Sequence, residues 1–270
     1  MNKLKKLFKA VLLIIKNPAL LNKVLDDENV NHEQVIKKYN LPHGLKTIDI
    51  NDLLPDFNET IEPYCSLDGG STPIDLALLK GIAKRKPECM YFEIGTWRGE
   101  SAANAASAAK TCVTLNLPDE KMLQMGLDKN YVGLHRFFSK DLKNVKHIQA
   151  DSQTFDYSSL NQKFDLIFID GDHHSESVKN DTANAFKILK DTDSIIVWHD
   201  YGNTPNDIRW DVLQGILDGT PSEKRSNLYH VSNTLCAIYT SRKINAVYIR
   251  PFSQPEKYFS ISVKSLLIKP

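Results

Sequence analysis

The chain has 270 residues, of which 41% are hydrophobic and 25% charged, and its formal net charge is +1 at pH 7. This composition is ordinary for a globular protein, and the length suits one large α/β domain with additions or two small domains. The near-neutral charge excludes an overall field that attracts nucleic acid, and no apolar run reaches the ~20 residues that span a bilayer. Four scattered cysteines without a CxxC pair indicate reduced core cysteines, as expected of a cytoplasmic protein.

Residues 1–25 predict an amphipathic, strongly basic helix. Apolar residues recur at helical spacing, and lysines lie between them. No small-residue cleavage site follows the apolar stretch, so a secretory signal is not expected. Two interpretations stay open. The helix lies on an anionic membrane, which would make the protein peripheral at the inner face, or it packs on the domain or on a sister subunit of a homo-oligomer.

Residues 26–70 are polar and interrupted by proline and glycine. We expect one short helix over 32–39 and otherwise an irregular arm, which we interpret as a lid over a ligand crevice. A helix over 74–84 begins after Ser71-Thr72-Pro73, with proline in its first turn. We therefore divide the chain into an N-terminal helix and arm (1–70), a main domain (71–240) and a C-terminal β extension (241–270).

From residue 90 onward, apolar strand-like runs alternate with helical segments. This alternation predicts a mostly parallel sheet with helices on both faces. The expected strands are 90–94, 111–117, 145–150, 164–169 and 194–198. The expected helices start near 101, 117, 177 and 208, and a further helix is expected over 131–138. An antiparallel pair over 228–231 and 235–239 follows, and the tail predicts a hairpin from 246–249 and 258–263.

Each of the five main strands ends in polar residues, and the carboxyl ends of parallel strands meet at one edge of a sheet. We therefore expect a small-molecule site there. The ends are Glu93 with the turn Gly95 to Gly99, Asn116, Asp151-Ser152, Asp170 to His174, and His199-Asp200-Tyr201. The turn reads G-x-x-x-G and lacks the middle glycine of the dinucleotide pattern G-x-G-x-x-G, which argues against a nicotinamide cofactor.

This ordered set of strand ends resembles the class I S-adenosylmethionine-dependent methyltransferases. It is most similar to the small-molecule O-methyltransferase group that includes macrolide-sugar methyltransferases and cephalosporin hydroxylase-like proteins. The resemblance covers about residues 72–240 and implies a Rossmann-like, mostly parallel seven-stranded sheet and S-adenosylmethionine as cofactor.

The resemblance also implies roles for single residues around the cofactor. Its methionine end would meet Glu93, Gly95, Thr96 and Gly99, with Trp97 packed on it and Ser101 opening the helix that faces it. Asn116 stands where an acidic residue usually holds the ribose hydroxyls, and Asp119 follows three residues later. Asp151 would accept the adenine amino group and Ser152 would donate nearby, while Asp170 borders the cofactor site.

The resemblance further implies a metal-assisted reaction. A divalent cation can lower the pKa of an acceptor hydroxyl and orient it toward the sulfonium methyl group. Its ligands would be Asp170, His199 and Asp200, and carboxylate ligands suit Mg²⁺ or Mn²⁺. His173 is our candidate general base, with His199 as ligand or supporting group, although their roles could be exchanged.

The leading hypothesis is methyl transfer from S-adenosylmethionine to an oxygen of a small molecule, with a sugar hydroxyl of a glycan as the favoured acceptor. One alternative is a hydroxylase-like enzyme on the same fold, which would need redox iron. Another is a non-catalytic cofactor-binding accessory protein, in which Asn116 marks an altered site. Nucleic acid is not expected as a partner.

Overall fold

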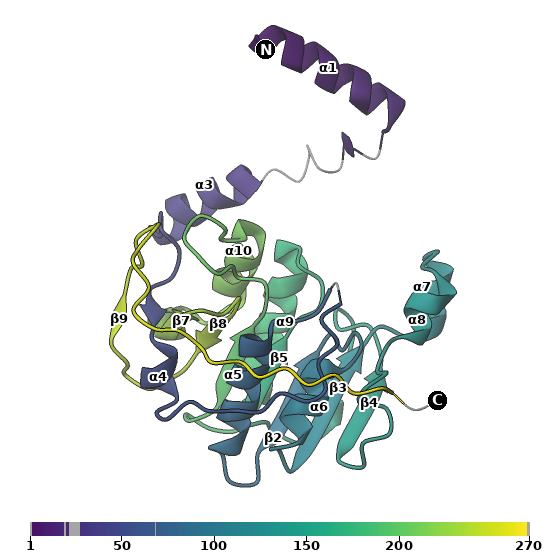
Figure 1. Cartoon of the computed structure of the whole chain (residues 1–270), viewed down its shortest axis with the longest axis vertical. Helices are drawn as coiled ribbons and strands as arrows, with labels where there is room; N and C mark the ends of the chain where they lie inside the picture. Colours follow the sequence, from purple (N-terminus) through teal and green to yellow (C-terminus); the bar gives the residue numbers. More distant parts are fainter. Residues whose placement is uncertain (1, 19, 22–27, 68, 269–270) are drawn as a thin grey trace.

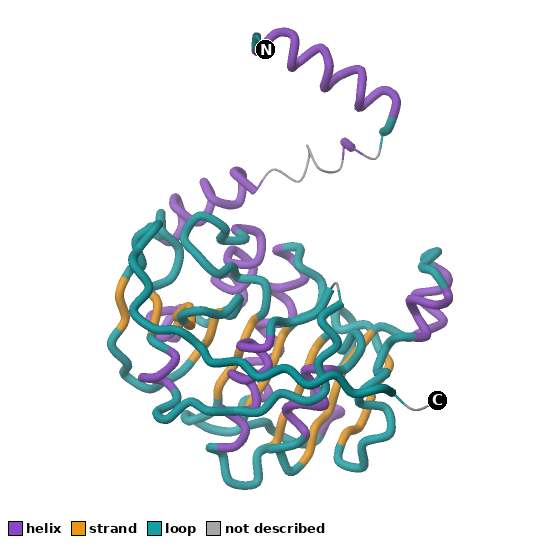
Figure 2. The backbone as a smooth tube through the Cα atoms, viewed as in Figure 1, coloured by secondary structure: helices purple, strands orange, loops and turns teal. Residues whose placement is uncertain are grey.

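A computed structural model describes residues 2–18, 20–21, 28–67 and 69–268 of the chain. A single twisted sheet runs through the main body (Figures 1 and 2). Its strand order is β4-β3-β2-β5-β6-β8-β7-β1-β9. The strands are β1 Thr47–Ile48, β2 Met90–Ile94, β3 Thr111–Asn116, β4 Val145–Gln149, β5 Leu166–Ile169, β6 Ile195–Trp198, β7 Leu228–Val231, β8 Ala237–Tyr239 and β9 Ala246–Val247.

The first five strands of that order are parallel, and β8 joins β6 in the antiparallel direction. The predicted α/β fold with a mostly parallel Rossmann-like sheet is confirmed. The described residues form nine strands rather than seven, because β1 pairs with β7 and β9 pairs with β1 at one edge of the sheet.

Side chains of β2 alternate between the two faces of the sheet, and each face is covered by helices. Phe92 and Ile94 face a core completed by α9 (Ser175–Ile188) and α10 (Trp210–Gly219). Tyr91 faces a second core under α5 (Pro73–Lys84) and α6 (Glu100–Ala106). This double coverage explains why the central strands read as nearly continuous apolar runs.

The expected lid is instead largely part of the main body. Helix α3 (Glu28–Tyr39) packs on α10, and β1 and α4 (Ile50–Leu53) bring Ile48, Ile50 and Leu53 into the core with no exposed surface. The arm is therefore not irregular throughout. Its expected stretches at 26–27 and at residue 68 lie outside the described residues.

Two further expectations are wrong. The helix expected over 131–138 is the short α8 (Lys129–Gly133), which follows α7 (Asp119–Gln124). The backbone beyond it turns back, and the N–H groups of Arg136 and Phe138 donate to the carbonyls of Trp97 and Arg98. The tail hairpin is also absent from the described residues: β9 pairs with β1, and residues 248–268 contain no strand. After a turn at 251–252, this segment crosses the body (Figure 1).

Helix α1 (Lys3–Lys16) lies apart from the main body (Figure 1), and none of its residues is buried. Residues 22–25 of the predicted N-terminal helix lie outside the described residues. Every described helix is too short or too polar to cross a bilayer.

Candidate active site

The turn after β2 is built on two glycines with positive φ angles, +84° at Gly95 and +81° at Gly99. A Cβ atom at Gly95 would lie 2.0 Å from the backbone oxygen of Asp170, and one at Gly99 would lie 2.3 Å from Oγ of Ser139. Both glycines are thus required by close packing against the chain itself. This packing fixes the turn beside the end of β5, where Asp170 is located.

Glu93 is fully buried beneath this turn. The hydroxyl of Tyr91 donates to its Oε2 atom at 2.6 Å, whereas Oε1 has no hydrogen-bond partner among the described residues. Burial raises the pKa of Glu93 to about 8. The contact of Glu93 with the methionine end of the cofactor stays a prediction, and a buried oxygen without a partner in the described structure suits an ammonium donor.

Asn116 supports the glycine turn from the end of β3. Its side-chain oxygen accepts from the N–H of Thr96 at 3.2 Å, and its amide donates to the carbonyl of Leu117 at 3.1 Å. Asp119, the nearby carboxylate, forms an ion pair with Arg136 at 2.5 Å. Both groups expected near a ribose therefore already have partners within the chain.

Trp97 lies within the turn, with a positive φ of 40°. Its ring packs on Tyr131 at 4.3 Å between centroids and meets the edge of His135 at 4.9 Å. Its Nε1 atom is buried without a hydrogen-bond partner in the described structure. Trp97 thus joins the turn to α8, a contact that the sequence did not predict.

Asp151 and Ser152 follow β4, as predicted, and lie next to a buried carboxylate that the sequence analysis did not select. Asp151 forms an ion pair with Lys121, which lowers the pKa of Asp151. Asp181 on α9 accepts from the side chain of Gln153 at 3.2 Å, while its Oδ2 atom has no described partner. Burial raises the pKa of Asp181 to about 7.

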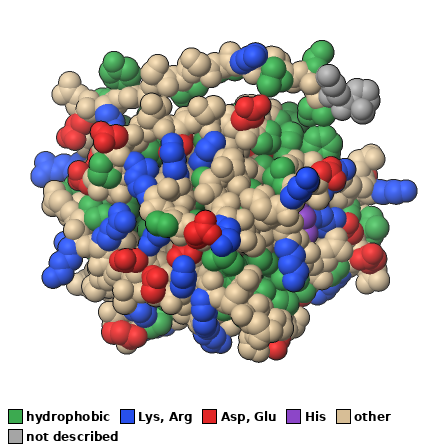
Figure 3. All heavy atoms as spheres, turned by 90° about the horizontal axis from the view of Figure 1, so that it is seen from below, with side chains coloured by type: hydrophobic (Ala, Val, Ile, Leu, Met, Phe, Trp, Pro, Cys, Tyr) green, Lys and Arg blue, Asp and Glu red, His purple; other side chains and the backbone are tan. Residues whose placement is uncertain are grey.

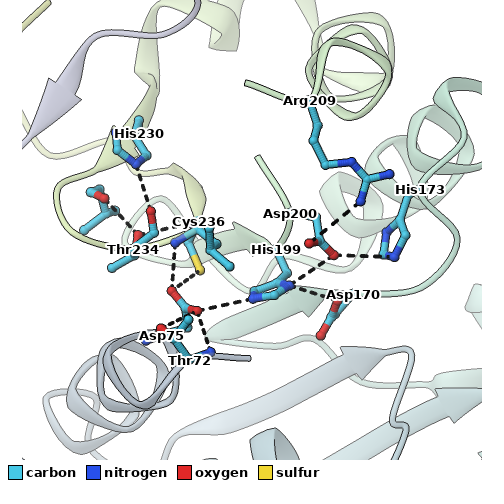
Figure 4. Close-up of polar contacts among 12 residues, drawn as sticks. Thr72, Asp75, Asp170, His173, His199, Asp200, Arg209, His230, Thr234 and Cys236 are labelled. Carbon is cyan, nitrogen blue, oxygen red and sulfur yellow. Dashed lines mark hydrogen bonds and ion pairs between the residues drawn. The ribbon is translucent and has the colours of Figure 1, made fainter. Parts of the chain in front are cut away.

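The three predicted metal ligands meet at the ends of β5 and β6 (Figure 4). One ligand atom from each of Asp170, His199 and Asp200 can be chosen so that all three atoms lie within 4.8 Å of one another. Nδ1 of His199 lies 3.3 Å from Oδ1 of Asp170 and 3.2 Å from Oδ2 of Asp200. Neither contact has hydrogen-bond geometry, so the buried Nδ1 atom has no hydrogen-bond partner in the described part of the chain.

Asp75 holds the other side of the His199 ring, and this residue was missed by the sequence analysis. Its Oδ2 atom lies 3.3 Å from Nε2 of His199, and the carboxylate also accepts from the backbone N–H groups of Thr72 and Leu235 at 2.8 and 2.9 Å. The only sequence signal was a charged residue within the apolar helix 74–84, which also fits a helix cap. Asp75 in fact serves as both cap and histidine partner.

Three carboxylates around one imidazole determine the electrostatics of this cluster. Burial alone would lower the pKa of His199, but the charge of Asp170 and the contacts with Asp170, Asp200 and Asp75 raise it well above its usual value. Burial opposes ionisation of Asp200, yet contact with His199 lowers its pKa to about 2. The cluster therefore carries excess negative charge and favours a cation, either a proton or a metal ion, at Nδ1.

His173 lies at the open side of the cluster. Its side chain is 41% exposed, and its Nε2 atom lies 3.4 Å from Oδ2 of Asp200. Arg209 approaches the same carboxylate, with Nη1 3.8 Å from Oδ1. His174 points toward a different partner, Asp172, at 2.5 Å. Of the two adjacent histidines, His173 thus contacts a predicted metal ligand and His174 contacts Asp172.

Residues 92–201 match the family model described as "Methyltransferase domain", and no curated protein matches the sequence. This segment includes all the predicted site residues. The match indicates a methyltransferase domain over these residues, and the mostly parallel α/β sheet of the structure agrees with it.

Three solved structures illustrate the structural similarity. TrmN from Thermus thermophilus is 18% identical, with a TM-score of 0.38, and the match covers 49% of this chain and 39% of that one. CalS10, an amino pentose methyltransferase from Micromonospora echinaspora, is 16% identical, with a TM-score of 0.37 and coverage of 52% and 55%. An O-methyltransferase from Bacillus cereus in complex with SAH is 15% identical, with a TM-score of 0.42 and coverage of 83% and 96%. The chain spans 39% and 55% of the lengths of the first two.

Proposed function

We propose that the chain transfers the methyl group of S-adenosylmethionine to an oxygen of a small-molecule acceptor, assisted by a divalent cation. The observation that carries this proposal is the convergence of Asp170, His199 and Asp200 beside the glycine turn of a methyltransferase domain. The turn is the expected cofactor side of the site, and the three ligand atoms form the expected acceptor side.

The donor set suits a cation such as Mn²⁺ or Mg²⁺. Two carboxylates provide hard oxygen ligands, and Nδ1 of His199 offers a nitrogen without a hydrogen-bond partner in the described structure. A hydrogen bond from Nε2 to Asp75 would leave the lone pair on Nδ1, which is the usual arrangement of a metal-binding histidine. When bound, the cation would lower the pKa of the acceptor hydroxyl.

The proposed reaction breaks the bond between the methyl carbon and the sulfonium sulfur and forms a bond from that carbon to the acceptor oxygen. The proton leaves the hydroxyl for Nε2 of His173 and then passes to solvent, since this side chain is 41% exposed. The sulfonium is already activated, so alignment of the acceptor accounts for most of the required rate acceleration. A sugar hydroxyl, including one on a glycan, is our preferred acceptor because two carboxylates and an imidazole suit a polar, hydroxylated ligand.

One specific observation bears on a non-catalytic role. The side chain of Asn116 is engaged with Thr96 and Leu117, and Asp119 is paired with Arg136. An accessory protein that binds the cofactor without turnover therefore remains the second candidate. An iron hydroxylase is not favoured, because non-haem Fe(II) oxygenases hold iron with two histidines and one carboxylate, whereas this cluster has one histidine and two carboxylates.

Calorimetric titration with S-adenosylmethionine and with Mn²⁺ tests the proposal. We expect both to bind, and we expect Asp170→Asn to abolish Mn²⁺ binding. Asp172→Asn is the matched control, because Asp172 lies two residues further on and contacts His174 instead. Absence of S-adenosylmethionine binding would overturn the proposal, and methylation that survives both EDTA and Asp200→Ala would remove the cation from it.

The role of His173 is tested separately with a labelled methyl group and a panel of hydroxylated acceptors. His173→Gln should lower the methylation rate by ~10²-fold or more, because it removes the proposed general base. His174→Gln changes the neighbouring histidine in the same way and should leave the rate nearly unchanged. Equal effects of the two substitutions would show that His173 is not the base. Cofactor binding without turnover of any acceptor would favour the accessory role.

A further inference from the structure

Helix α1 separates apolar and basic residues onto opposite sides. With 3.6 residues per turn, seven apolar side chains project from one side: Leu4, Leu7, Phe8, Val11, Leu12, Ile14 and Ile15. Lys5, Lys6, Lys9 and Lys16 project from the other, together with Leu13. The apolar side is therefore continuous along the whole helix.

Nothing in the described structure covers this apolar side. Leu4, Phe8 and Ile15 are 76, 69 and 69% exposed, and no residue of α1 is buried. Figure 1 shows the helix standing away from the sheet and its covering helices. An isolated helix of 14 residues is marginally stable in water, so α1 needs an external apolar surface to hold its conformation.

The charge of the segment determines which surface fits. Residues 1–21 contain five lysines and no aspartate or glutamate. On the face of the main body seen from below, by contrast, acidic and basic side chains are interspersed (Figure 3). A second copy of α1 would place lysine beside lysine at the edges of the paired apolar sides, whereas anionic lipid headgroups would complement every lysine.

We propose that α1 docks the protein on a bilayer that contains anionic lipids. The helix lies in the plane of the interface, with its apolar side among the acyl chains and its lysines at the headgroups. The main body then stays in water beside the surface. Helix α1 contributes no residue to the methyltransferase site, so membrane docking does not depend on the proposed reaction.

The test is co-sedimentation of the full chain with vesicles of phosphatidylcholine, either alone or with added phosphatidylglycerol. We expect binding to the mixed vesicles and little binding to neutral ones. Leu7→Asp should weaken partitioning by at least ~tenfold, because it removes a lipid-facing leucine. Leu13→Asp is the matched control: it makes the same chemical change, but on the lysine side, and should have a smaller effect.

A second pair of substitutions tests the electrostatic part. Lys5→Gln with Lys9→Gln should lower affinity for mixed vesicles by roughly thirtyfold, since each lysine near an anionic surface increases the binding constant about fivefold. Binding to neutral vesicles should not change. Because α1 buries nothing in the main body, all variants should keep the thermal midpoint of the wild type.

Three results would overturn the inference. The first is no sedimentation with mixed vesicles, and the second is equal binding of Leu7→Asp and Leu13→Asp. The third is a stable dimer that Leu7→Asp converts to a monomer while vesicles fail to bind the wild type, which would assign the apolar side to a second copy of the chain.

Discussion

Oδ2 of Asp75 lies 3.3 Å from Nε2 of His199, and this contact joins the first turn of α5 to the end of β6. Asp75 is completely buried, and its carboxylate also accepts from the backbone N–H of Leu235 at 2.9 Å. It thereby fixes the ring of His199 at Nε2, while Nδ1 on the opposite side of the ring faces Asp170 and Asp200 (Figure 4). A residue 124 positions away in the sequence thus orients the proposed metal ligand.

We expect Asp75→Asn to weaken Mn²⁺ binding by ~10- to 100-fold, because a partner that orients a metal-binding histidine typically contributes this much to affinity. The measurement is calorimetric titration. Asp128→Ala is the control: it removes the carboxylate that caps α8 and should lower the free energy of unfolding by about 1 kcal/mol with little effect on Mn²⁺. Unchanged affinity in Asp75→Asn would show that Asp75 acts only as a helix cap.

Gly95→Ala tests the packing of the glycine turn against β5. The new methyl group would lie 2.0 Å from the backbone oxygen of Asp170, so the end of the strand must shift. We expect a loss of roughly 2–5 kcal/mol in the free energy of unfolding, from left-handed strain together with overpacking. The measurement is urea denaturation.

Gly126→Ala separates the cost of left-handed backbone strain from the cost of overpacking. Gly126 has a similar φ of +86°, but no atom lies within 4 Å of the position that a Cβ would take there, so only the strain of about 1–2 kcal/mol should remain. If both variants lose the same amount, the contact with Asp170 does not determine the cost.

Tyr201→Phe tests whether the segment before β1 belongs to the main body. The backbone N–H of Leu45 donates to the hydroxyl of Tyr201 at 2.8 Å in a buried position. Removing this acceptor leaves the N–H unsatisfied and should lower the free energy of unfolding by about 1–3 kcal/mol. Tyr229→Phe on the nearby β7 removes a hydroxyl with no hydrogen-bond partner in the described structure and should have a smaller effect. Equal losses would contradict the docking role of Tyr201.

The central strands and the meeting of their polar ends at one edge of the sheet could be predicted because their signals are local. Each central strand is an apolar run buried on both faces, and each is followed at once by polar residues such as Asp170 or His199. Parallel strands bring those ends to one edge whatever their separation in the sequence. The convergence of the three predicted ligands is therefore confirmed, although their binding of a metal stays a prediction.

Other features depend on tertiary contacts and leave no local pattern. Strand β1 has only two residues and is defined by its pairing with β7 and β9. The segment 258–263 has strand-like residues but no neighbouring strand in the described structure, so propensity alone misled the prediction. The contact of Asn116 with Thr96 could not be predicted from the sequence either, since an asparagine after a strand suits a ligand or a turn equally well.

The buried carboxyl of Glu93 predicts a distinct dependence of stability on pH. Burial raises its pKa in the folded protein to about 8, against an ordinary value of 4.5. Between these values the folded state keeps a proton that the unfolded state has lost. The free energy of unfolding therefore falls as pH rises through this window, by up to ~1.4 kcal/mol per pH unit from this group. Above the window it levels off. Asp181, whose pKa is raised to about 7, contributes in the same direction.

Glu93→Gln removes the titrating proton while keeping an oxygen that can accept from Tyr91 at the position of the 2.6 Å hydrogen bond. We expect the variant to gain stability relative to the wild type as pH increases from 5 to 8, measured by urea denaturation at each pH. Glu256→Gln, at an exposed position in the tail, should shift the curve equally at every pH if it shifts it at all. If the stability difference between Glu93→Gln and the wild type does not change with pH, Glu93 is not held protonated in the folded protein. Its oxygen without a described partner would then need a cation rather than a proton.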